Sequence, residues 1–158
     1  MKESENLGAG VKFSEQAQMK GILEYRIYRN GKLEEETKEE NLIVTVGRTQ
    51  MAKLLAGDFT KRNVSQISFG TNGTAPALEN TVITGAYKKA ISSINFPAAG
   101  QVRFNWNLAT TEANGKAILE FGLICADDTL FSRRVRESGK PINKESDISL
   151  EGSWTIIF

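Results

Sequence analysis

The sequence predicts a mostly β protein: an antiparallel β-sandwich, jelly-roll-like, with one short helix and an extended N-terminal arm. Segments with an apolar residue at every second position recur at intervals of roughly 8–14 residues, the pattern typical of sandwiches. Turn-forming dipeptides separate several of them, among them Asn30-Gly31 and Asn114-Gly115. The connections are too short for parallel crossovers, so we expect antiparallel pairing.

The 158 residues suit a single domain, which we place at residues 20–158. Residues 1–19 are polar and show neither the helical nor the strand period. They are either a disordered tail or an arm that becomes ordered only against a neighbouring subunit. The second interpretation has candidate anchors in Val11, Phe13 and Met19.

The first strands are predicted to form a hairpin. Leu23, Tyr25 and Ile27 alternate with polar residues, which indicates a strand with one solvated face. Asn30-Gly31 favours a type I′ turn because both residue types tolerate a positive φ. The returning residues 33–40 are polar on both faces and predict an exposed ribbon or an edge strand.

One helix is expected near residues 46–56. Thr45 is a candidate N-cap, and Gly57 is placed to end the helix in the left-handed conformation. Apolar residues follow the helical spacing i, i+3, i+4 at Met51, Leu54 and Leu55. Since no Gly-Lys-Ser/Thr follows Gly47, we expect a helix packed on a sheet and not a phosphate-binding loop.

The remaining chain is predicted to be β. Residues 102–108 alternate strictly, residues 116–125 are apolar except for Glu120, and residues 148–158 alternate up to Phe158. We therefore expect 116–125 to be a central strand and 148–158 to lie inside the sheet. Trp106 and Trp154 fall on apolar faces and are predicted to belong to the core.

Composition narrows the function classes. The chain has no histidine, which removes Ser-His and Cys-His nucleophilic sites and the commonest transition-metal ligand. The single Cys125 forms no intramolecular disulfide, so assembly in a reducing cytoplasm is the simpler expectation. A net charge of +1 gives no attraction to nucleic acid, and no apolar run is long enough to span a bilayer.

Candidate catalytic and metal-binding acids remain. Glu120 is a lone carboxylate in an apolar strand, either an acid/base group or the partner of Arg133 or Arg134 on the next strand. The ion pair is favoured because no second catalytic group is in evidence. Four acids offer oxygen ligands for Ca²⁺ but match no known loop spacing, so we predict turn-forming roles and no metal for Asp127, Asp128, Glu145 and Asp147.

Two charged segments are candidate interface elements. The acidic one contains Glu34, Glu35 and Glu36, followed by Glu39 and Glu40. The basic one contains Arg133, Arg134 and Arg136, followed by Lys140 and Lys144. We expect the two to meet, within one chain or between neighbours, where they would set register more than affinity.

Several segments together resemble a family of small tailed-bacteriophage virion proteins of the tail-fibre or tail-accessory type. They cover roughly residues 41–158, in matching order and spacing, and read NLIVTVGRTQMAKLLAG, ISFGTNGTAPALENT, TEANGKAILEFGL, LFSRRV and SLEGSWTIIF.

The resemblance implies a non-enzymatic β-sandwich building block of a virion, made in the bacterial host cytoplasm and assembled in many copies with itself and other virion proteins. It implies no cofactor, no nucleic-acid partner and no catalytic residues. A tail or neck position is expected, with capsid decoration or a head fibre as the alternative. A second alternative function is a module that binds carbohydrate on the host surface. Tyr28 and Tyr87 are the candidate exposed aromatics that would contact this ligand.

Overall fold

The computed structural model describes residues 19–158 apart from residue 138. One helix, α2 (Thr45–Leu55), accompanies the strands. These are β1 (Lys20–Arg29), β2 (Lys32–Ile43), β3 (Val64–Gly70), β4 (Tyr87–Ala90), β5 (Ser93–Asn95), β6 (Gln101–Leu108), β7 (Ala117–Ile118), β8 (Glu120–Cys125), β9 (Leu130–Val135), β10 (Ile142–Asn143) and β11 (Ile148–Ile157).

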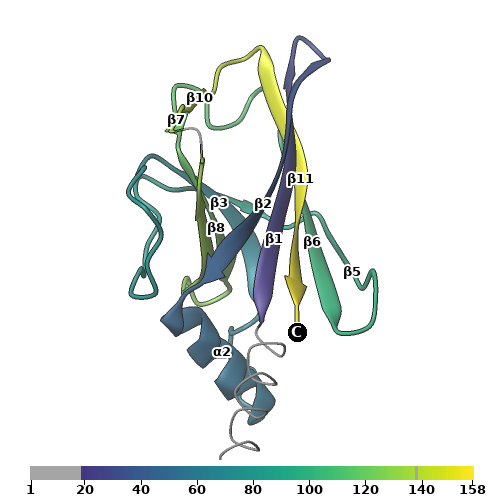
Figure 1. Ribbon diagram of the computed structural model, residues 1–158, viewed down its shortest axis with the longest axis vertical. Helices are drawn as coiled ribbons and strands as arrows, with labels where there is room; N and C mark the ends of the chain where they lie inside the picture. The colour runs from purple at the N-terminus through teal and green to yellow at the C-terminus, as the bar shows by residue number, and fades with distance from the viewer. Residues whose placement is uncertain (1–18, 138) are drawn as a thin grey trace, which may run out of the picture.

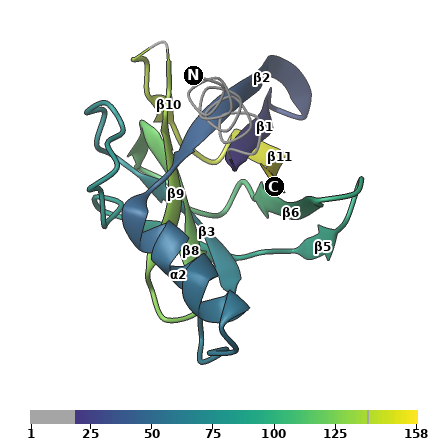
Figure 2. The same ribbon diagram turned by 60° about the horizontal axis from the view of Figure 1, so that its bottom comes forward.

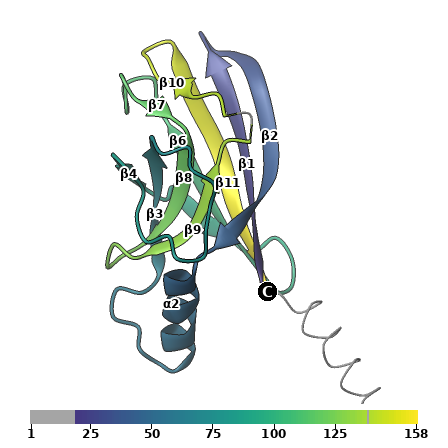
Figure 3. The ribbon, with the colours of Figure 1, turned by 60° about the vertical axis from the view of Figure 1, so that its left-hand side comes forward.

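The strands form a large curled sheet in the order β4-β3-β8-β9-β2-β1-β11-β6-β5, and β10 pairs with β7 separately. All pairs are antiparallel, as the short connections predicted. The sheet folds into two layers, one containing β1, β2, β11 and β6, the other β3, β4, β8 and β9 (Figures 1 and 3). The predicted mostly β, sandwich-like fold is confirmed.

The two layers are joined on both sides. On one side, Leu42 and Ile43 at the end of β2 pair with β9. On the other, β4 pairs with β3 and β5 pairs with β6, although only residues 91–92 separate β4 from β5. The remainder of β2 pairs with β1 alone, so the prediction of an edge strand is correct for residues 32–41.

The core lies between the layers and is rich in aromatic rings. Tyr25 and Phe121 have ring centroids 4.8 Å apart, and Phe69 stands edge-on to Trp106 at 5.5 Å. Both tryptophans are buried, as predicted, and every residue of β8 is buried, as expected of a central strand. Burial of these rings together with the aliphatic core residues is the main driving force for folding.

Local predictions at the turns and the helix are mostly confirmed. Asn30 and Gly31 have φ values of 51° and 78°, the left-handed pair that a type I′ turn requires. Gly57 ends α2 with a φ of 92°. The predicted Thr45 cap is wrong, because Val44 occupies the N-cap position and makes no side-chain hydrogen bond. Val44 is buried, and its N–H donates to the Phe131 carbonyl.

Helix α2 lies at one end of the sandwich, against β9 (Figure 2). A Cβ on Gly47 would stand 2.8 Å from the Cα of Phe131, so only glycine permits this approach. Gly47 is therefore a packing residue, in agreement with the prediction of a helix packed on the sheet. Within the described part of the chain, no helix is both long and apolar enough to cross a bilayer.

Candidate functional site

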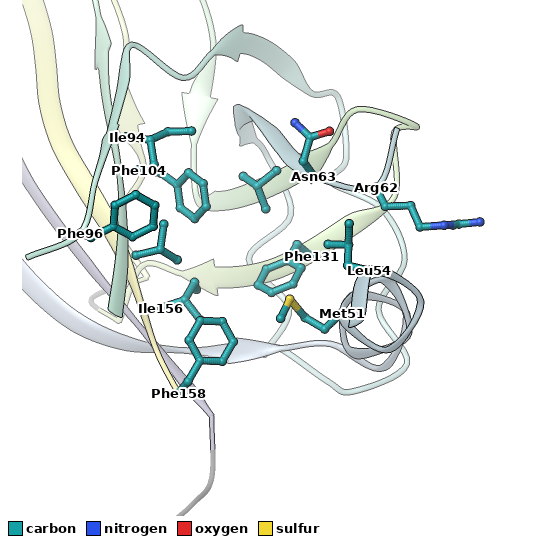
Figure 4. Close-up of a pocket in the computed structure, with 12 residues that line it drawn as sticks. Met51, Leu54, Arg62, Asn63, Ile94, Phe96, Phe104, Phe131, Ile156 and Phe158 are labelled. Atoms are coloured by element: carbon teal, nitrogen blue, oxygen red, sulfur yellow. The ribbon is translucent and has the colours of Figure 1, made fainter. Parts of the chain in front are cut away.

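An apolar groove of about 280 Å³ opens at the end of the sandwich that carries α2. Figure 4 shows Met51 and Leu54 of α2 on one wall and Phe96 on the opposite wall, with Phe158 at the rim. The Arg62 side chain points away from the hollow. The lining residues are Met51, Leu54, Arg62, Asn63, Val64, Ile94, Phe96, Val102, Phe104, Phe131, Ile156 and Phe158.

The groove exists because both layers end here without covering their last inward-facing side chains. Phe104 and Phe131 are buried, whereas Phe96 is 77% exposed and Phe158 is 53% exposed. Phe158 had been predicted to lie inside the sheet, and this prediction is wrong. The period-two pattern does reach Phe158, but the sheet pairing of β11 stops at Ile157, leaving Phe158 at the rim.

The N-terminal segment joins the molecule beside this groove. Lys20 pairs with Ile157, so the register brings Met19 next to Phe158. Met19 packs against the core cluster of its own chain, so its role as an anchor on a neighbouring subunit stays a prediction. The other two candidate anchors, Val11 and Phe13, lie outside the described residues.

A buried polar network occupies the β8–β9 layer. Glu120 and Arg133 are both essentially unexposed, and the Arg133 Nε donates to Glu120 Oε1 at 2.8 Å. The other carboxylate oxygen accepts the backbone N–H groups of Asn72 at 2.8 Å and Thr84 at 3.1 Å. The prediction that Glu120 is an ion-pair partner is thus confirmed, with Arg133 as the partner.

Arg133 also fixes the loop that connects β3 to β4. Its Nη1 donates to Asn80 Oδ1 at 2.9 Å, and its Nη2 donates to the carbonyl oxygens of Asn72 and Thr74 at 3.1 and 3.0 Å. The network therefore holds residues 71–84 against the sheet. Arg133 is 1% exposed, so its side chain serves this network and does not extend a basic surface.

The acidic and basic segments meet within the chain along β2 and β9. Arg136 donates to both Glu35 oxygens at 3.1 Å, and its Nη1 also donates to the Tyr25 hydroxyl at 2.9 Å. Arg134 pairs with Glu39. In the register, Glu35 and Glu39 stand opposite the core residues Ile27 and Leu23, so β2 turns acids toward the inside of the sandwich.

These contacts shift the pKa values of the groups involved. Partial burial raises the pKa of Glu35, but hydrogen bonds from Arg136 and Thr37 outweigh it, and the pKa lies below its ordinary value. Burial raises the pKa of Tyr25 despite the nearby Arg136 cation. These groups belong to one cleft, lined by Tyr25, Glu35, Thr37, Glu39, Arg136 and Glu137. Its charged side chains form ion pairs within the chain. Arg136 is buried and meets the acidic segment within the chain, one of the two predicted arrangements.

Of the other members of the two charged segments, Glu34 and Glu36 lie at the surface and Lys144 is buried. Glu34 is exposed and pairs with Arg29 at 3.1 Å. Glu36 is exposed on the face of β2 opposite to Glu35, and its interface role stays a prediction. Lys144 is buried instead of extending a basic surface, since its Nζ donates to Asn114 Oδ1 at 2.7 Å and to two backbone carbonyls.

The four candidate calcium ligands do not converge. Asp127 accepts from Gln50 at 2.9 Å, Asp128 pairs with Lys88 at 3.0 Å, and Asp147 pairs with Arg29 at 2.7 Å. Across residues 19–158 without 138, no three His, Cys, Asp or Glu side chains are grouped to hold a metal ion. Turn formation is confirmed for Asp127 and Asp128 between β8 and β9, and for Glu145 and Asp147 in the turn before β11.

The two candidate ligand-contact aromatics lie apart. Tyr28 is on β1, half-buried, and its hydroxyl donates to Glu151 Oε1 at 2.8 Å. Tyr87 is on β4, half-buried, and packs against the core cluster. The prediction that both are exposed is therefore corrected, and they do not form one site.

The period-two and helical patterns did not predict the groove. Ile94 and Phe96 belong to a segment with loose alternation, and Met51 and Leu54 looked like ordinary helix packing residues. The only available signal was the density of aromatics near residues 96–106 together with the final Phe158. Searches with the sequence and fold found no matching protein-family model, no matching curated protein and no matching solved structure.

Proposed function

We propose that this chain is a non-enzymatic structural protein of a tailed-bacteriophage virion, a multicopy β-sandwich building block of the tail or neck. The proposal starts from the resemblance carried by five segments between residues 41 and 158. It agrees with the sandwich-like fold. Capsid decoration and a head fibre are alternative positions for the same building block.

The observation that carries the proposal is the asymmetry of the molecule's two ends. One end bears the apolar groove, the helix and the root of the N-terminal segment. The opposite end carries the polar β1–β2 hairpin (Figure 1). An apolar end beside a chain terminus suits attachment to other protein copies, because exposed apolar patches commonly mark interaction sites.

The buried polar residues favour a structural role over a catalytic one. Glu120, the strongest catalytic candidate, has both oxygens occupied by Arg133 and two backbone amides. Lys144 is similarly enclosed by hydrogen-bond acceptors. These groups lock loops onto the sheet, which supports a module that presents loops 70–81 and 137–146 in a fixed shape to a neighbour or a host surface.

Quantitative mass spectrometry of purified virus particles tests the proposal. We expect many copies per particle, with a multiple of three or six for a tail or neck component and hundreds for capsid decoration. A variant without residues 1–18, which retains Met19, should fold but fail to incorporate. Absence of the full chain from particles would overturn the virion assignment.

Binding to host carbohydrate is a second candidate, favoured by one surface. Tyr28, Asn107, Ser149 and Glu151 line a shallow depression of about 250 Å³ on the outer face of the β1–β11–β6 sheet. An aromatic ring beside amide and hydroxyl groups suits a sugar. Glycan-array binding that is lost in Tyr28→Ala but kept in Leu33→Ser would support it, and an array without signal for the wild-type chain would refute it.

A further inference from the structure

We infer that the apolar groove is the contact surface for a second copy of this chain, whose residues 1–18 enter the groove through Phe13. The inference deepens the proposed function by naming the partner at this end of the molecule, and it rests on that proposal for its biological setting. Its physical basis is the groove, its rim and the position at which the N-terminal segment emerges.

The rim, meaning the exposed edge of the groove and the surface next to it, carries several large apolar side chains that are in contact with solvent in a single copy. Large exposed apolar side chains gather on α2, the loop after it, the β5–β6 hairpin and the end of β11. Three of them line the groove, namely Ile94 (52% exposed), Phe96 (77%) and Phe158 (53%). Two more follow the groove-lining Leu54 in the chain, namely Leu55 (91%) and Phe59 (72%). Soluble monomers rarely expose so many large apolar groups at one end, and such groups typically mark a protein contact.

The N-terminal segment starts within reach of a groove at this end. Met19 stands beside Phe158, and six residues lead back from Met19 to Phe13, a fully extended length of about 20 Å. The segment carries three glutamates and two lysines, whereas residues 45–62 carry four cationic side chains and one aspartate. This difference in charge favours docking of the segment next to α2.

A second copy explains the rim as well as the groove. The large apolar residues of the segment, Leu7, Val11 and Phe13 after Met1, can fill the groove, but they leave the rim largely uncovered. Another copy brings its own apolar rim together with its segment. Because groove and segment root lie at the same end, two copies can exchange segments about a two-fold axis and bury the roughly 1,000 Å² that a stable interface needs.

Analytical ultracentrifugation of the full chain over a range of concentrations is the first test. We expect reversible association that Phe13→Ser and Phe96→Ser each weaken roughly tenfold or more, the loss typical of a central apolar contact. Leu33→Ser is the matched control, because Leu33 is 54% exposed but lies on the β1–β2 hairpin at the opposite end. Thermal unfolding of each variant checks that the fold is retained.

Cysteine cross-linking identifies the occupant directly. One full-length preparation carries Phe13→Cys, another carries Phe96→Cys, and the two are mixed with oxidised glutathione as the oxidant. The native Cys125 does not compete, because it is fully buried and burial raises the pKa of its thiol to about 11. We expect a mixed dimer linked between positions 13 and 96 as the main product.

Other outcomes overturn the inference in distinguishable ways. A full chain that stays monomeric, with a doubly substituted chain closing an internal disulfide, means that each segment fills its own groove. Association that is lost in Phe96→Ser but unchanged in Phe13→Ser means that rims meet without the segment. Either result leaves the virion assignment intact if particles contain the protein, whereas a self-associating chain that is absent from particles refutes the proposed function alone.

Discussion

At the scale of single residues, the most constrained side chain is Arg133. Its guanidinium connects Glu120 on β8 with three oxygen acceptors in the loop between β3 and β4. A buried ion pair contributes little compared with an apolar pair of the same size, but removing one partner leaves an uncompensated buried charge. Loss of Arg133 alone should therefore cost more stability than replacement of Arg133 and Glu120 together by apolar residues.

Replacing Arg133 with Met should destabilise the protein by about 3–5 kcal/mol, because the Glu120 carboxylate stays buried without its cation. Urea denaturation measures the free energy of unfolding. Arg26→Gln is the matched control, since the exposed Arg26–Glu151 pair at 3.0 Å should contribute less than about 1 kcal/mol. Equal losses in the two variants would contradict the role assigned to burial.

Glu35 should make part of the stability depend on pH. Its pKa in the folded state lies below the ordinary value of 4.5, so the carboxylate stabilises the fold above that pH. The contribution disappears as the pH falls through the folded-state pKa. Because the side chain is 39% exposed, solvent screening limits the effect to roughly 0.5–1 kcal/mol.

The measurement is the melting temperature of wild type and Glu35→Gln between pH 7 and pH 3. We expect the Glu35→Gln substitution to lower the melting temperature at pH 7 and the two curves to converge at low pH. Glu36→Gln, on the exposed face of the same strand, should follow the wild-type curve. A gap that widens toward acid would show that Glu35 does not stabilise through its charge.

At the scale of elements, helix α2 depends on Gly47. Alanine is favoured over glycine inside a helix by up to about 1 kcal/mol. Here the new Cβ would stand 2.8 Å from the Phe131 Cα, and backbone cannot move aside as a flexible side chain does. Overpacking of this kind costs about 1–3 kcal/mol, so it should outweigh the gain in helix propensity.

We therefore expect Gly47→Ala to lower the free energy of unfolding by roughly 1–2 kcal/mol in chemical denaturation. Gly73→Ala is the control, since its added Cβ would come no closer than 3.4 Å to its nearest neighbour, the Leu119 Cδ1. A neutral or stabilising Gly47→Ala would mean that α2 shifts away from β9 at little cost.

The sequence predicted the secondary-structure elements better than it predicted which residues of other elements they contact. Alternation located β1, β6 and β11, and Asn30-Gly31 determined the first hairpin because its positive φ requirement is local. The acidic inner side of β2 was not predictable, since it depends on Arg134 and Arg136, about a hundred residues away, arriving opposite it. Glu120 was paired correctly because its partner lies on the neighbouring strand.

The groove escaped prediction for a related reason. An apolar residue at the end of an alternating run looks the same whether the sheet continues over it or stops. The strand pairing of β1 with β11 ends at Lys20 and Ile157. This end of the pairing, which the alternation does not reveal, explains why Ile156 is buried and Phe158 is exposed. The prediction of Thr45 as the N-cap was wrong because Val44, a buried core residue, occupies the N-cap position.

At the scale of the whole molecule, β11 is the strand on which one layer depends. It lies between β1 and β6 and contributes the buried Leu150, Trp154 and Ile156. A chain ending at Asp147 should therefore show no cooperative unfolding transition and no near-ultraviolet circular dichroism. A chain lacking residues 1–18 should retain both, and native signals in the shorter C-terminal variant would refute this dependence.

The pairing of β1 with β11 also affects how the protein is made. About 120 residues separate the two strands, and at ribosomal rates of roughly 5–20 residues per second β1 waits some 6–24 s for its partner. During that time β2 can cover one side of β1, while the other side stays open to strand pairing with nascent chains nearby. The charged β2 and the early Asn-Gly turn thus shield one edge of β1 in the newborn chain, and the second edge is closed only when β11 arrives.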